Sequence, residues 1–446
     1  MHKRMERADQ ELKDKLISSF FAFEEEMNLE NDHHHMRDDA IKVFEEKGFP
    51  TKKLEEWKYT SLKSVLNPQY NLFPKKEKSL EYNDIKKYCI HDIDSYQLVF
   101  VDGIFSSHLS TTTHDKFDAC LMSSFLNKPK YKPLVEKYFN QATPKESMDA
   151  LNTAFSKEGA YIRVPKGVTA EKPVQILNFS TGSDEKLMLQ PRNLVILEEG
   201  SEVEVIERHQ SLTENEVLTN SVTEIFLEKN AKLDYYKIQN DKSKASLIDN
   251  TYVNQAESSD CEVYTFSFGG KLIRNNLHYF QNGEFIKSSM KGVTIIEGKQ
   301  HVDHNTLVHH KQPNCESHQD YKGIYADRST GVFNGRVLVD KIAQKTNAFQ
   351  SNNNILIDDK ATINSKPQLE IFADDVACSH GCTIGELDDE ALFYLRSRGI
   401  PEKEARALLM FAFANNVLDS VNIPELKRRI TKQIANKIGV SLGFEL

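Results

Sequence analysis

Charged and polar residues dominate the beginning of the chain, with apolar positions spaced among them. Leu12, Leu16 and Phe20 are examples within charged, helix-favouring sequence. Gly48-Phe49-Pro50 ends this pattern, because glycine suits a helix C-terminus and a residue before proline is pushed out of the helical region. We therefore predict two helices within residues 8–48.

The hydrophobic pattern changes twice after residue 50. Residues 51–150 mix short apolar runs with polar loops, which favours a small α/β region. From about residue 155 to 377, β-branched and aromatic residues alternate with polar ones, and no stretch has a convincing helical period. This pattern predicts a long all-β segment.

Turn-like clusters recur within the β segment at intervals of about 30 residues. They are Gly200-Ser201, Asn230-Ala231 and Ser258-Ser259-Asp260, then Ser329-Thr330-Gly331 and Lys360-Ala361. A period of this length is typical of a solenoid, so we predict a β-helix whose stacked coils bury a continuous apolar column. A β-sandwich is the alternative, but its turns should lie nearer ~10 residues apart.

The pattern becomes helical again after residue 386. Asp388-Asp389-Glu390 places acids at a helix start, Gly399 suits a helix end, and Pro401 and Pro424 open later helices. We predict helices near 388–398, 402–419 and 424–438. The chain thus divides into an N-terminal helical and small α/β region, a β-helix core and a C-terminal helical domain, at residues 1–150, 151–385 and 386–446.

Composition limits the classes of partner and compartment. The formal charge is −9 and basic residues are interspersed with acidic ones, so nucleic acid is not expected as a partner. The first twenty residues lack the apolar stretch of a secretory signal. The longest apolar run, Ala407 to Ala414, is far short of the ~20 residues that cross a bilayer. We expect a cytoplasmic protein without membrane association and with reduced thiols.

Cys378, His380 and Cys382 lie at positions i, i+2 and i+4. Side chains alternate faces in an extended segment, so these three would project the same way and present the chemistry of a soft-metal or iron–sulfur site. Ser379 and Gly381 suggest an irregular strand end, and three ligands form an incomplete set. The alternative is two core cysteines beside a hydrogen-bonded histidine.

A second group of potential ligands consists of His301, His304, His309, His310, Cys315 and His318. Its spacing matches no fixed zinc pattern, and we assign it no ligand role. The phosphate-binding loop G-x-x-x-x-G-K-[ST] is missing, since Gly269-Gly270-Lys271 is followed by leucine. G-x-S-x-G and H-E-x-x-H are also missing. We therefore expect that this chain binds no nucleotide and is no self-contained hydrolase.

Four large apolar residues and two arginines stand together in the first C-terminal helix. The run is Leu392, Phe393, Tyr394, Leu395, Arg396, Ser397, Arg398 and Gly399. So many apolar side chains exceed one stripe of a short helix. A partner-binding face is one interpretation, and burial within the helical domain is the other.

Several of these segments together resemble the SufB/SufD family of iron–sulfur cluster assembly proteins, most closely its SufD branch. The strongest matches are Lys366 to Ile371, Ala373 to Val376, Cys378 to Gly381 and Leu392 to Ile400, with support from Glu56 to Thr60, Gly335 and Asn352 to Asn354. The Cys378-x-His380 pair and Leu395 favour SufD, because the similar helix of SufB usually carries cysteine near the position of Leu395. The resemblance covers essentially the whole chain.

This resemblance implies a mainly β fold, a right-handed parallel β-helix core flanked by N-terminal and C-terminal helical domains. It implies pairing with a SufB-like protein through the β-helix ends, and docking of a SufC-like ABC ATPase on Leu392 to Gly399. The chain would then be a non-catalytic scaffold subunit, since the ATPase activity belongs to the SufC-like partner. A homodimer of the isolated chain is left open.

The resemblance also ranks the candidate ligands. His380 is the first candidate to bind a transient iron–sulfur cluster shared with the partner, and Cys378 is the second. Cys382 departs from the family pattern, because many relatives have a small residue there, so it adds a ligand or merely fills space. Two other hypotheses are a β-helix enzyme that acts on polysaccharide and a self-contained metalloprotein that uses the three residues.

Overall fold

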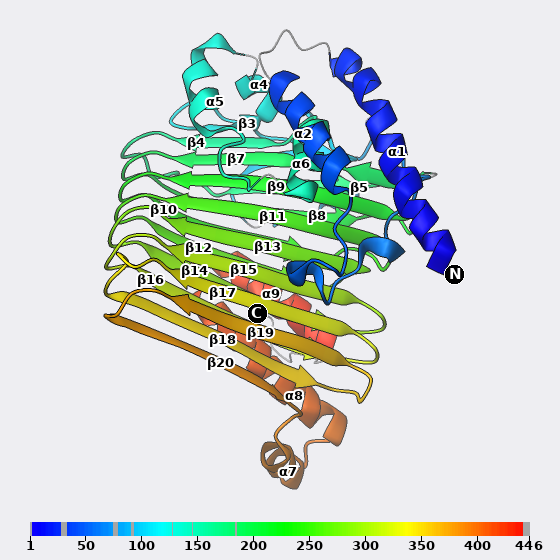
Figure 1. Cartoon of the computed structure of the whole chain (residues 1–446). Helices are drawn as coiled ribbons and strands as arrows, with labels where there is room; N and C mark the ends of the chain where they lie inside the picture. The colour runs from blue at the N-terminus through cyan, green and yellow to red at the C-terminus, as the bar shows by residue number, and fades with distance from the viewer. Residues whose placement is uncertain are drawn as a thin grey trace.

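The computed structural model describes residues 2–27, 34–74, 79–90, 93–126, 128–144, 146–182 and 185–439. A long parallel β-solenoid forms the body of the molecule, with helices beside it from both ends of the chain (Figure 1). The prediction of a mainly β chain with a parallel β-helix between N-terminal and C-terminal helices is confirmed. None of the helices in the described residues is long and apolar enough to cross a membrane.

In the described residues, the solenoid consists of two ten-stranded sheets, here called sheet A and sheet B. Sheet B contains, in spatial order, β2 (Ile104–Phe105), β1 (Tyr96–Val101), β5 (Val174–Ser180), β8 (Glu202–Ser211), β10 (Lys232–Gln239), β12 (Asp260–Ser267), β14 (Lys287–Ile296), β16 (Glu316–Tyr325), β18 (Thr346–Leu356) and β20 (Val376–Gly385). Sheet A contains β19 (Thr362–Ile371), β17 (Thr330–Val339), β15 (His301–His310), β13 (Leu272–Gln281), β11 (Ala245–Gln255), β9 (Val217–Leu227), β7 (Arg192–Leu197), β4 (Ala160–Val164) and β3 (Asp118–Leu121), and β6 (Leu187–Leu189) pairs with β9.

From β4 and β5 onward, the strands pair in parallel with the strand one coil away, as the repeat predicts, whereas β2 pairs with β1 and β3 with β4 in antiparallel fashion. Lys232 of β10, for example, lies in register with Asp260 of β12. The turn clusters mark corners of the coils, where Gly200, Asn230 and Ser258 have positive φ angles of 67°, 58° and 58°. The β-sandwich alternative is therefore wrong.

The solenoid interior contains the continuous apolar column that we predicted, but it is not apolar throughout. Part of it is apolar, with buried Val205, Leu233 and Val263 in contact from coil to coil. Another part is charged, because Lys237 Nζ lies 2.9 Å from Glu207 Oε2 and 2.8 Å from Asp249 Oδ2. The alternating pattern indicates which residues face inward, but not whether the opposite sheet supplies a partner for a polar one.

The N-terminal helices cover the outer face of sheet A. They are α1 (His2–Met27), α2 (His34–Lys47) and α6 (Ser147–Phe155), and the first two agree with the predicted pair. Leu16, Phe44 and Leu151 belong to one buried apolar cluster with Leu218 and Ile248 of the sheet. Packing against the solenoid, as well as helix propensity, therefore stabilises these helices.

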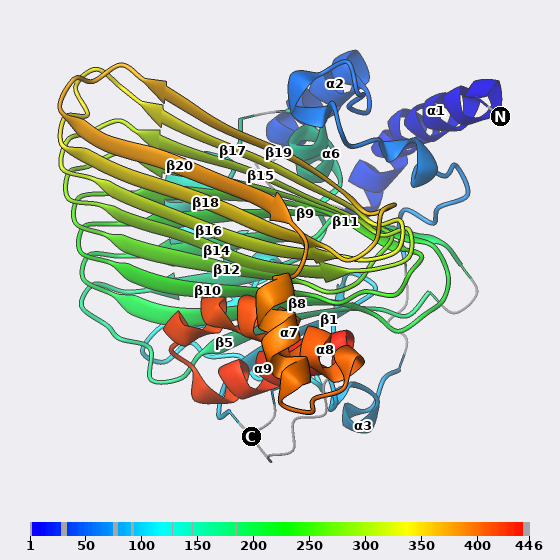
Figure 2. The ribbon, with the colours of Figure 1, turned by 90° about the horizontal axis from the view of Figure 1, so that it is seen from below.

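The later C-terminal helices lie against the outer face of sheet B (Figure 2), whereas the first of them contacts the second and projects away from the sheet. The C-terminal elements are α7 (Asp389–Ser397), α8 (Glu402–Asn415), the 3₁₀ turn η4 (Asn416–Ser420) and α9 (Pro424–Ile438). Leu418 and Ile430 lie in one apolar cluster with Tyr236 and Phe266 of the sheet. The three predicted helices agree with this structure, except that the second ends as an α-helix at Asn415.

The predicted mixture of helices and strands within residues 51–150 is present, but its strands extend the solenoid. Val99 of β1 pairs in parallel with Leu177 of β5, and β3 continues sheet A. A boundary at residue 150 therefore remains a prediction. The other elements of this region are η1 (Glu55–Trp57), η2 (Leu62–Ser64), α3 (Tyr82–Ile85), α4 (Met122–Leu126), η3 (Pro129–Tyr131) and α5 (Lys132–Tyr138).

Two residues of the Glu56 to Thr60 run tie this segment to sheet A. The guanidinium carbon of Arg274 lies 3.9 Å from the ring centroid of Trp57. The Thr60 hydroxyl donates to Asp303 and lies 2.9 Å from His301 Nε2. Asp303 also pairs with Arg274. The run therefore has a structural role, because it fastens residues on the N-terminal side of the chain to β13 and β15.

Candidate functional site at the open end of the solenoid

The last coil has no neighbour on one side. Among the described strands, β20 pairs with β18 alone and β19 with β17 alone. The coil lies at the bottom of the solenoid in Figure 1 and presents two strand edges there. Such edges are templates for pairing with another chain.

The three candidate ligands lie in the middle of a regular strand. β20 runs for ten residues, from Val376 to Gly385, and pairs with β18 along its length. The predicted irregular end at Ser379 and Gly381 is therefore wrong, because pairing with β18 holds both residues in extended conformation.

All three candidate side chains lie on the inward face of β20. The register places Cys378, His380 and Cys382 beside Ala348, Gln350 and Asn352 of β18, which are all buried. Strand residues two apart share a face, so the predicted common face follows from the observed strand. In an inner coil these positions would be interior, but here no further coil covers them.

Exposure distinguishes the three candidates. Cys378 is partly buried against Val337 and Ala348, whereas His380 and Cys382 are exposed. Burial raises the pKa of the Cys378 thiol, although a backbone hydrogen bond at Ala348 acts in the opposite direction. Because the thiolate is the form that binds metal, His380 is the more accessible donor of the two in the isolated chain.

Asn352 connects both strands of the last coil. Its Oδ1 accepts hydrogen bonds from Asn354 Nδ2 at 2.8 Å and from Ser365 Oγ of β19 at 2.9 Å, and Cys382 Sγ lies 4.0 Å away. Cys382 is thus the candidate ligand whose side chain reaches the Asn352 amide on the neighbouring strand. The interval of 30 residues between Asn352 and Cys382 is the signal that could have linked them from the sequence.

Gln350 is the polar residue of β18 that lies directly beside His380 on the inward face. Its Nε2 donates to Gln319 Oε1 at 3.3 Å, but Gln350 Oε1 and Gln319 Nε2 are buried without a hydrogen-bond partner in the described part of the chain. A Cβ at Gly335 would lie 2.0 Å from Gln350 Nε2. The glycine that supported the family resemblance therefore makes room for this glutamine.

The described residues contain no group of three or more His, Cys, Asp or Glu side chains that could hold a metal ion. Same-face neighbours on a strand are about 6.6 Å apart, so β20 spreads its candidate ligands instead of closing them around one ion. This geometry gives no support to the hypothesis of a self-contained metalloprotein.

The second group of potential ligands is dispersed over both sheets and both faces. The nearest partners are Thr60 for His301, Thr294 for His304, Asp340 for His309, Ser317 for His310, Gly283 for Cys315 and Phe349 for His318. Each contact is an ordinary hydrogen bond or ring contact.

Helix α7 projects from the solenoid (Figure 1). Asp388 caps it by accepting hydrogen bonds from the backbone of the first turn, and Gly399, with φ of 86°, ends it. Leu392 is buried, whereas Phe393 and Tyr394 are 73% and 57% exposed. Leu395 is half-buried, and Arg396, Ser397, Arg398 and Gly399 are exposed.

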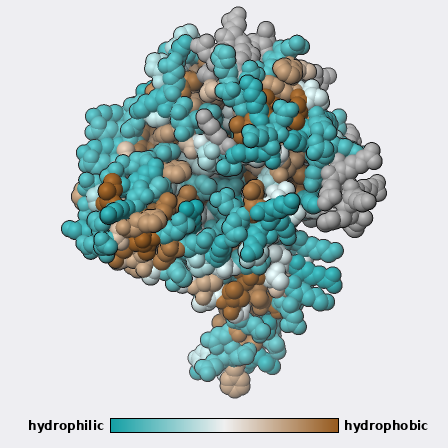
Figure 3. Space-filling view, in the orientation of Figure 1, coloured by the Kyte–Doolittle hydropathy of each residue, from teal (hydrophilic) through white to brown (hydrophobic). Residues whose placement is uncertain are grey.

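The exposed residues of α7 form a mixed aromatic and cationic surface. Arg398 Cζ lies 5.2 Å from the Tyr394 ring centroid, and Arg396 pairs with Glu402 of α8 at 3.4 Å. Hydrophobic side chains are visible on the projecting C-terminal hairpin in Figure 3. Simple burial within the helical domain therefore does not account for the run.

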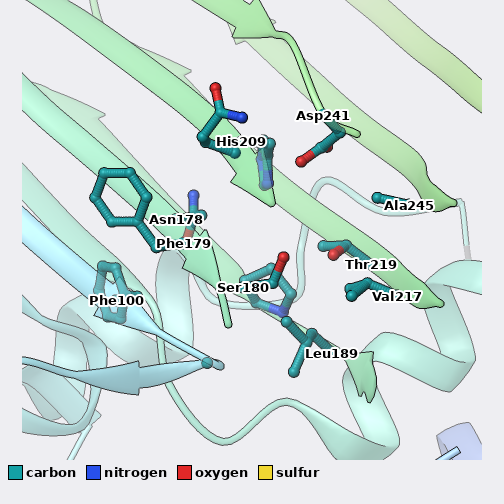
Figure 4. A pocket seen from close by; sticks show the side chains of 13 residues that line it. Phe100, Asn178, Phe179, Ser180, Leu189, His209, Val217, Thr219, Asp241 and Ala245 are labelled. Atoms are coloured by element: carbon teal, nitrogen blue, oxygen red, sulfur yellow. The ribbon is translucent and has the colours of Figure 1, made fainter. Parts of the chain in front are cut away.

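A small cavity lies inside the first coils of the solenoid. Figure 4 shows His209 and Asp241 at its wall, with Phe179 and Ser180 at the end of β5 also lining it. Its volume is about 20 Å³. This space suits about one water molecule, so the cavity is a packing feature and not a ligand site.

Two family models match this chain. Residues 179–413 match the model described as SUF system FeS cluster assembly, SufBD core domain. Residues 14–176 match the model described as SufBD protein N-terminal region.

Three similar proteins cover most of the chain. The iron–sulfur cluster assembly SufBD family protein of Synechocystis sp. is 32% identical over 396 residues, which cover 86% of this chain and 87% of that protein. The iron–sulfur cluster assembly protein SufD of Escherichia coli is 30% identical over 399 residues, covering 88% and 90%. The chloroplastic protein ABCI7 of Arabidopsis thaliana is 29% identical over 400 residues, covering 88% and 83%.

Proposed function

The chain belongs to the SufBD family of iron–sulfur cluster assembly proteins, and from this role in cluster assembly we propose that it is a SufD-like scaffold subunit. The proposal has three parts. The last coil pairs with a SufB-like protein, the inward face of β20 supplies ligands to a nascent cluster, and α7 docks a SufC-like ATPase. The observation that carries the proposal is the uncovered last coil with its row of donors.

Pairing through the last coil follows from its two strand edges and its exposed apolar groups. Ile371 and Phe372 at the end of β19 and Ile384 of β20 are exposed. The end of a second solenoid would cover these side chains and satisfy the edges of both sheets. We assign this surface to the SufB-like partner, while a homodimer would use the same edges when that partner is scarce.

His380 is the principal cluster ligand in this proposal, with Cys378 as the second donor. Imidazole and thiolate both bind iron in iron–sulfur centres. The cluster is cargo that passes on to other proteins, so a half-site completed by the partner suits assembly and release. Cys382, which contacts Asn352 of the neighbouring strand, is a third possible ligand to the cluster at the same surface.

Helix α7 is assigned to the ATPase. Tyrosine, tryptophan and arginine are enriched among residues that dominate binding energy, and α7 exposes an aromatic pair with two arginines. It connects to α8, whose Phe413 carbonyl accepts a hydrogen bond from Lys322 of β16 at 3.2 Å. Movement of a docked ATPase would therefore reach the solenoid through α8. Nucleotide binding and hydrolysis belong to the partner, and this chain is non-catalytic.

His380→Ala tests the ligand assignment in the complex co-purified with SufB-like and SufC-like partners. We expect an intact complex whose cluster yield falls about tenfold or more, since even indirect partners of a metal site are worth 10–100-fold. Ser379→Ala is the matched control, because it changes the neighbouring residue on the opposite face of β20. Normal cluster yield from His380→Ala would contradict the assignment.

Phe393→Ser combined with Tyr394→Ser tests the docking surface. We expect loss of the ATPase from the purified complex, with the SufB-like protein retained, since two such residues are worth about 2 kcal/mol or more each. Phe285→Ser is the control, because Phe285 is a similarly exposed aromatic residue far along the chain from α7. Undiminished ATPase binding by the double variant would remove α7 from the proposal.

Anaerobic reconstitution of the isolated chain separates a shared site from a self-contained one. We expect no stable stoichiometric cluster without the SufB-like partner, as measured by iron content and visible absorption. A stable cluster in the isolated chain would favour the metalloprotein alternative. The family assignment leaves the polysaccharide enzyme without support.

A further inference from the structure

A half-open cleft lies between the N-terminal helices and the segment that follows them. It lies between α1, the end of α2, the loop 49–53 and η2, and its volume is about 840 Å³. Pockets for small ligands span about 300–1,000 Å³. Its lining residues all precede residue 67, so none belongs to β19, β20 or α7.

Five lysines line this cleft, against one acidic residue, Asp9. They are Lys13, Lys47, Lys52, Lys53 and Lys63. The chain as a whole carries a net charge of −9, so the excess of positive charge in the cleft is opposite in sign to the net charge of the chain. Like charges repel when a fold brings them together, which indicates that the cleft suits an anion.

The five lysines come from four separate elements. The ammonium groups of three of these lysines have no partner in the described residues. Lys47 of α2 also pairs with Glu146 at 3.0 Å. Lys13, Lys52 and Lys53 form no ion pair or side-chain hydrogen bond there. Lys13 reaches from α1 across to α2, where its Nζ lies 3.6 Å from the place that a Cβ of Gly48 would occupy.

The wall between the lysines is apolar and rigidly held. Phe49, Pro50, Leu62 and Leu66 line the cleft and are buried. The segment that carries them is fastened to sheet A through Trp57, as described above. A preformed cleft with an apolar wall and several cations suits a ligand that combines both characters.

We propose that this cleft binds a small phosphorylated molecule with an apolar portion. Its phosphate would lie among the lysines, and its apolar part would pack against Phe49 and Leu66. This site does not depend on the assembly role proposed above. A volume of about 840 Å³, within the range of small-ligand pockets, favours a small molecule over an acidic peptide, whose binding is one outcome of the test.

Calorimetric titration of the full chain with phenyl phosphate tests the proposal, with phenol and pyrophosphate as comparison probes. We expect saturable binding of phenyl phosphate that weakens with added salt, weaker binding of pyrophosphate, and none of phenol. Lys13→Gln with Lys52→Gln and Lys53→Gln should weaken binding about tenfold or more, which corresponds to 1.4 kcal/mol.

Lys341→Gln with Lys360→Gln is the control, because both lysines are exposed and lie in the late coils. It should change the affinity less than about twofold. Equal thermal midpoints of all variants would verify that they fold. No saturable binding of phenyl phosphate, or equal weakening in the control, would overturn the proposal. Tighter binding of an octaglutamate peptide at the same lysines would reassign the cleft to an acidic protein segment.

Discussion

The middle coils and the last coil of the solenoid use the same strand geometry to opposite effect. In the middle, Lys237 lies between two carboxylates, and all three side chains are buried. In the last coil, His380 also lies on the inward face of its strand but remains exposed. An inward-facing residue is thus structural where another coil covers it and available for binding where none does.

The difference extends to hydrogen bonding. A buried charge without a partner is very costly, so Lys237 requires Glu207 and Asp249. Near the open end, buried amide atoms of Gln319 and Gln350 have no partner in the described structure. Both amide groups are buried, so at the open end a second molecule can reach the exposed His380 and not these amides.

Lys237→Met should have the largest effect on stability. It leaves two buried carboxylates without a cation, so we expect a loss of about 3–5 kcal/mol in the free energy of unfolding. Burial alone would lower the pKa of Lys237, but Asp249 and Glu207 outweigh it and raise the pKa. Denaturant unfolding measures the effect, and Lys360→Met, at an exposed position, is the control. A loss as small as that of the control would refute the prediction.

His304→Asn should change how stability depends on pH. Burial lowers the pKa of His304 from 6.5 to about 4, with Asp303 acting in the opposite direction. Between these values the unfolded state binds a proton that the folded state does not, so His304 makes stability fall as the pH drops, by about 1.4 kcal/mol per unit. The variant should lose that slope.

The free energy of unfolding of the unchanged chain and of the His304→Asn variant, measured between pH 4 and pH 6.5, gives the difference in its slope with pH. Above pH 7 the imidazole is neutral in the folded and unfolded states, so measurements there serve as the reference. If the stability of the unchanged chain and of the His304→Asn variant fell equally with pH below pH 7, His304 would be protonated in the folded protein and the prediction would be wrong.

Gln350→Leu should have the smallest effect on stability, within about 1 kcal/mol. The change removes one hydrogen bond of 3.3 Å, but also a buried oxygen that has no partner in the described structure. Gln319 Oε1 still accepts a hydrogen bond from Thr306 at 2.7 Å. Denaturant unfolding should place this variant close to the unchanged chain, and a loss near that of Lys237→Met would erase the distinction between the two regions.

Much of the fold was predictable because its signals are local. Asn230 and Ser258 stand at corners where a positive φ suits small polar residues, and their spacing reveals one coil. Pro424 marks the start of α9 where it was expected. The charged interior at Lys237 was not predictable, because its partner Asp249 comes from the other sheet and strand alternation carries no information about that contact.

The candidate site was predictable only in part, for the same reason. The spacing of Cys378, His380 and Cys382 indicates a common face. Their surroundings were missed, because Asn352 lies one coil earlier and Ser365 reaches it from the other sheet.

The sequence alone determined the period of the coils, the turns at their corners, the flanking helices and the two thiols and imidazole that share one face of a strand. These features follow from backbone geometry and from neighbours within a few residues. Which inward residues are buried, which polar groups meet and which strands end the sheets became clear from the folded chain. Those outcomes depend on contacts between coils and sheets, so the same inward face of sheet B is interior at Lys237 and surface at His380.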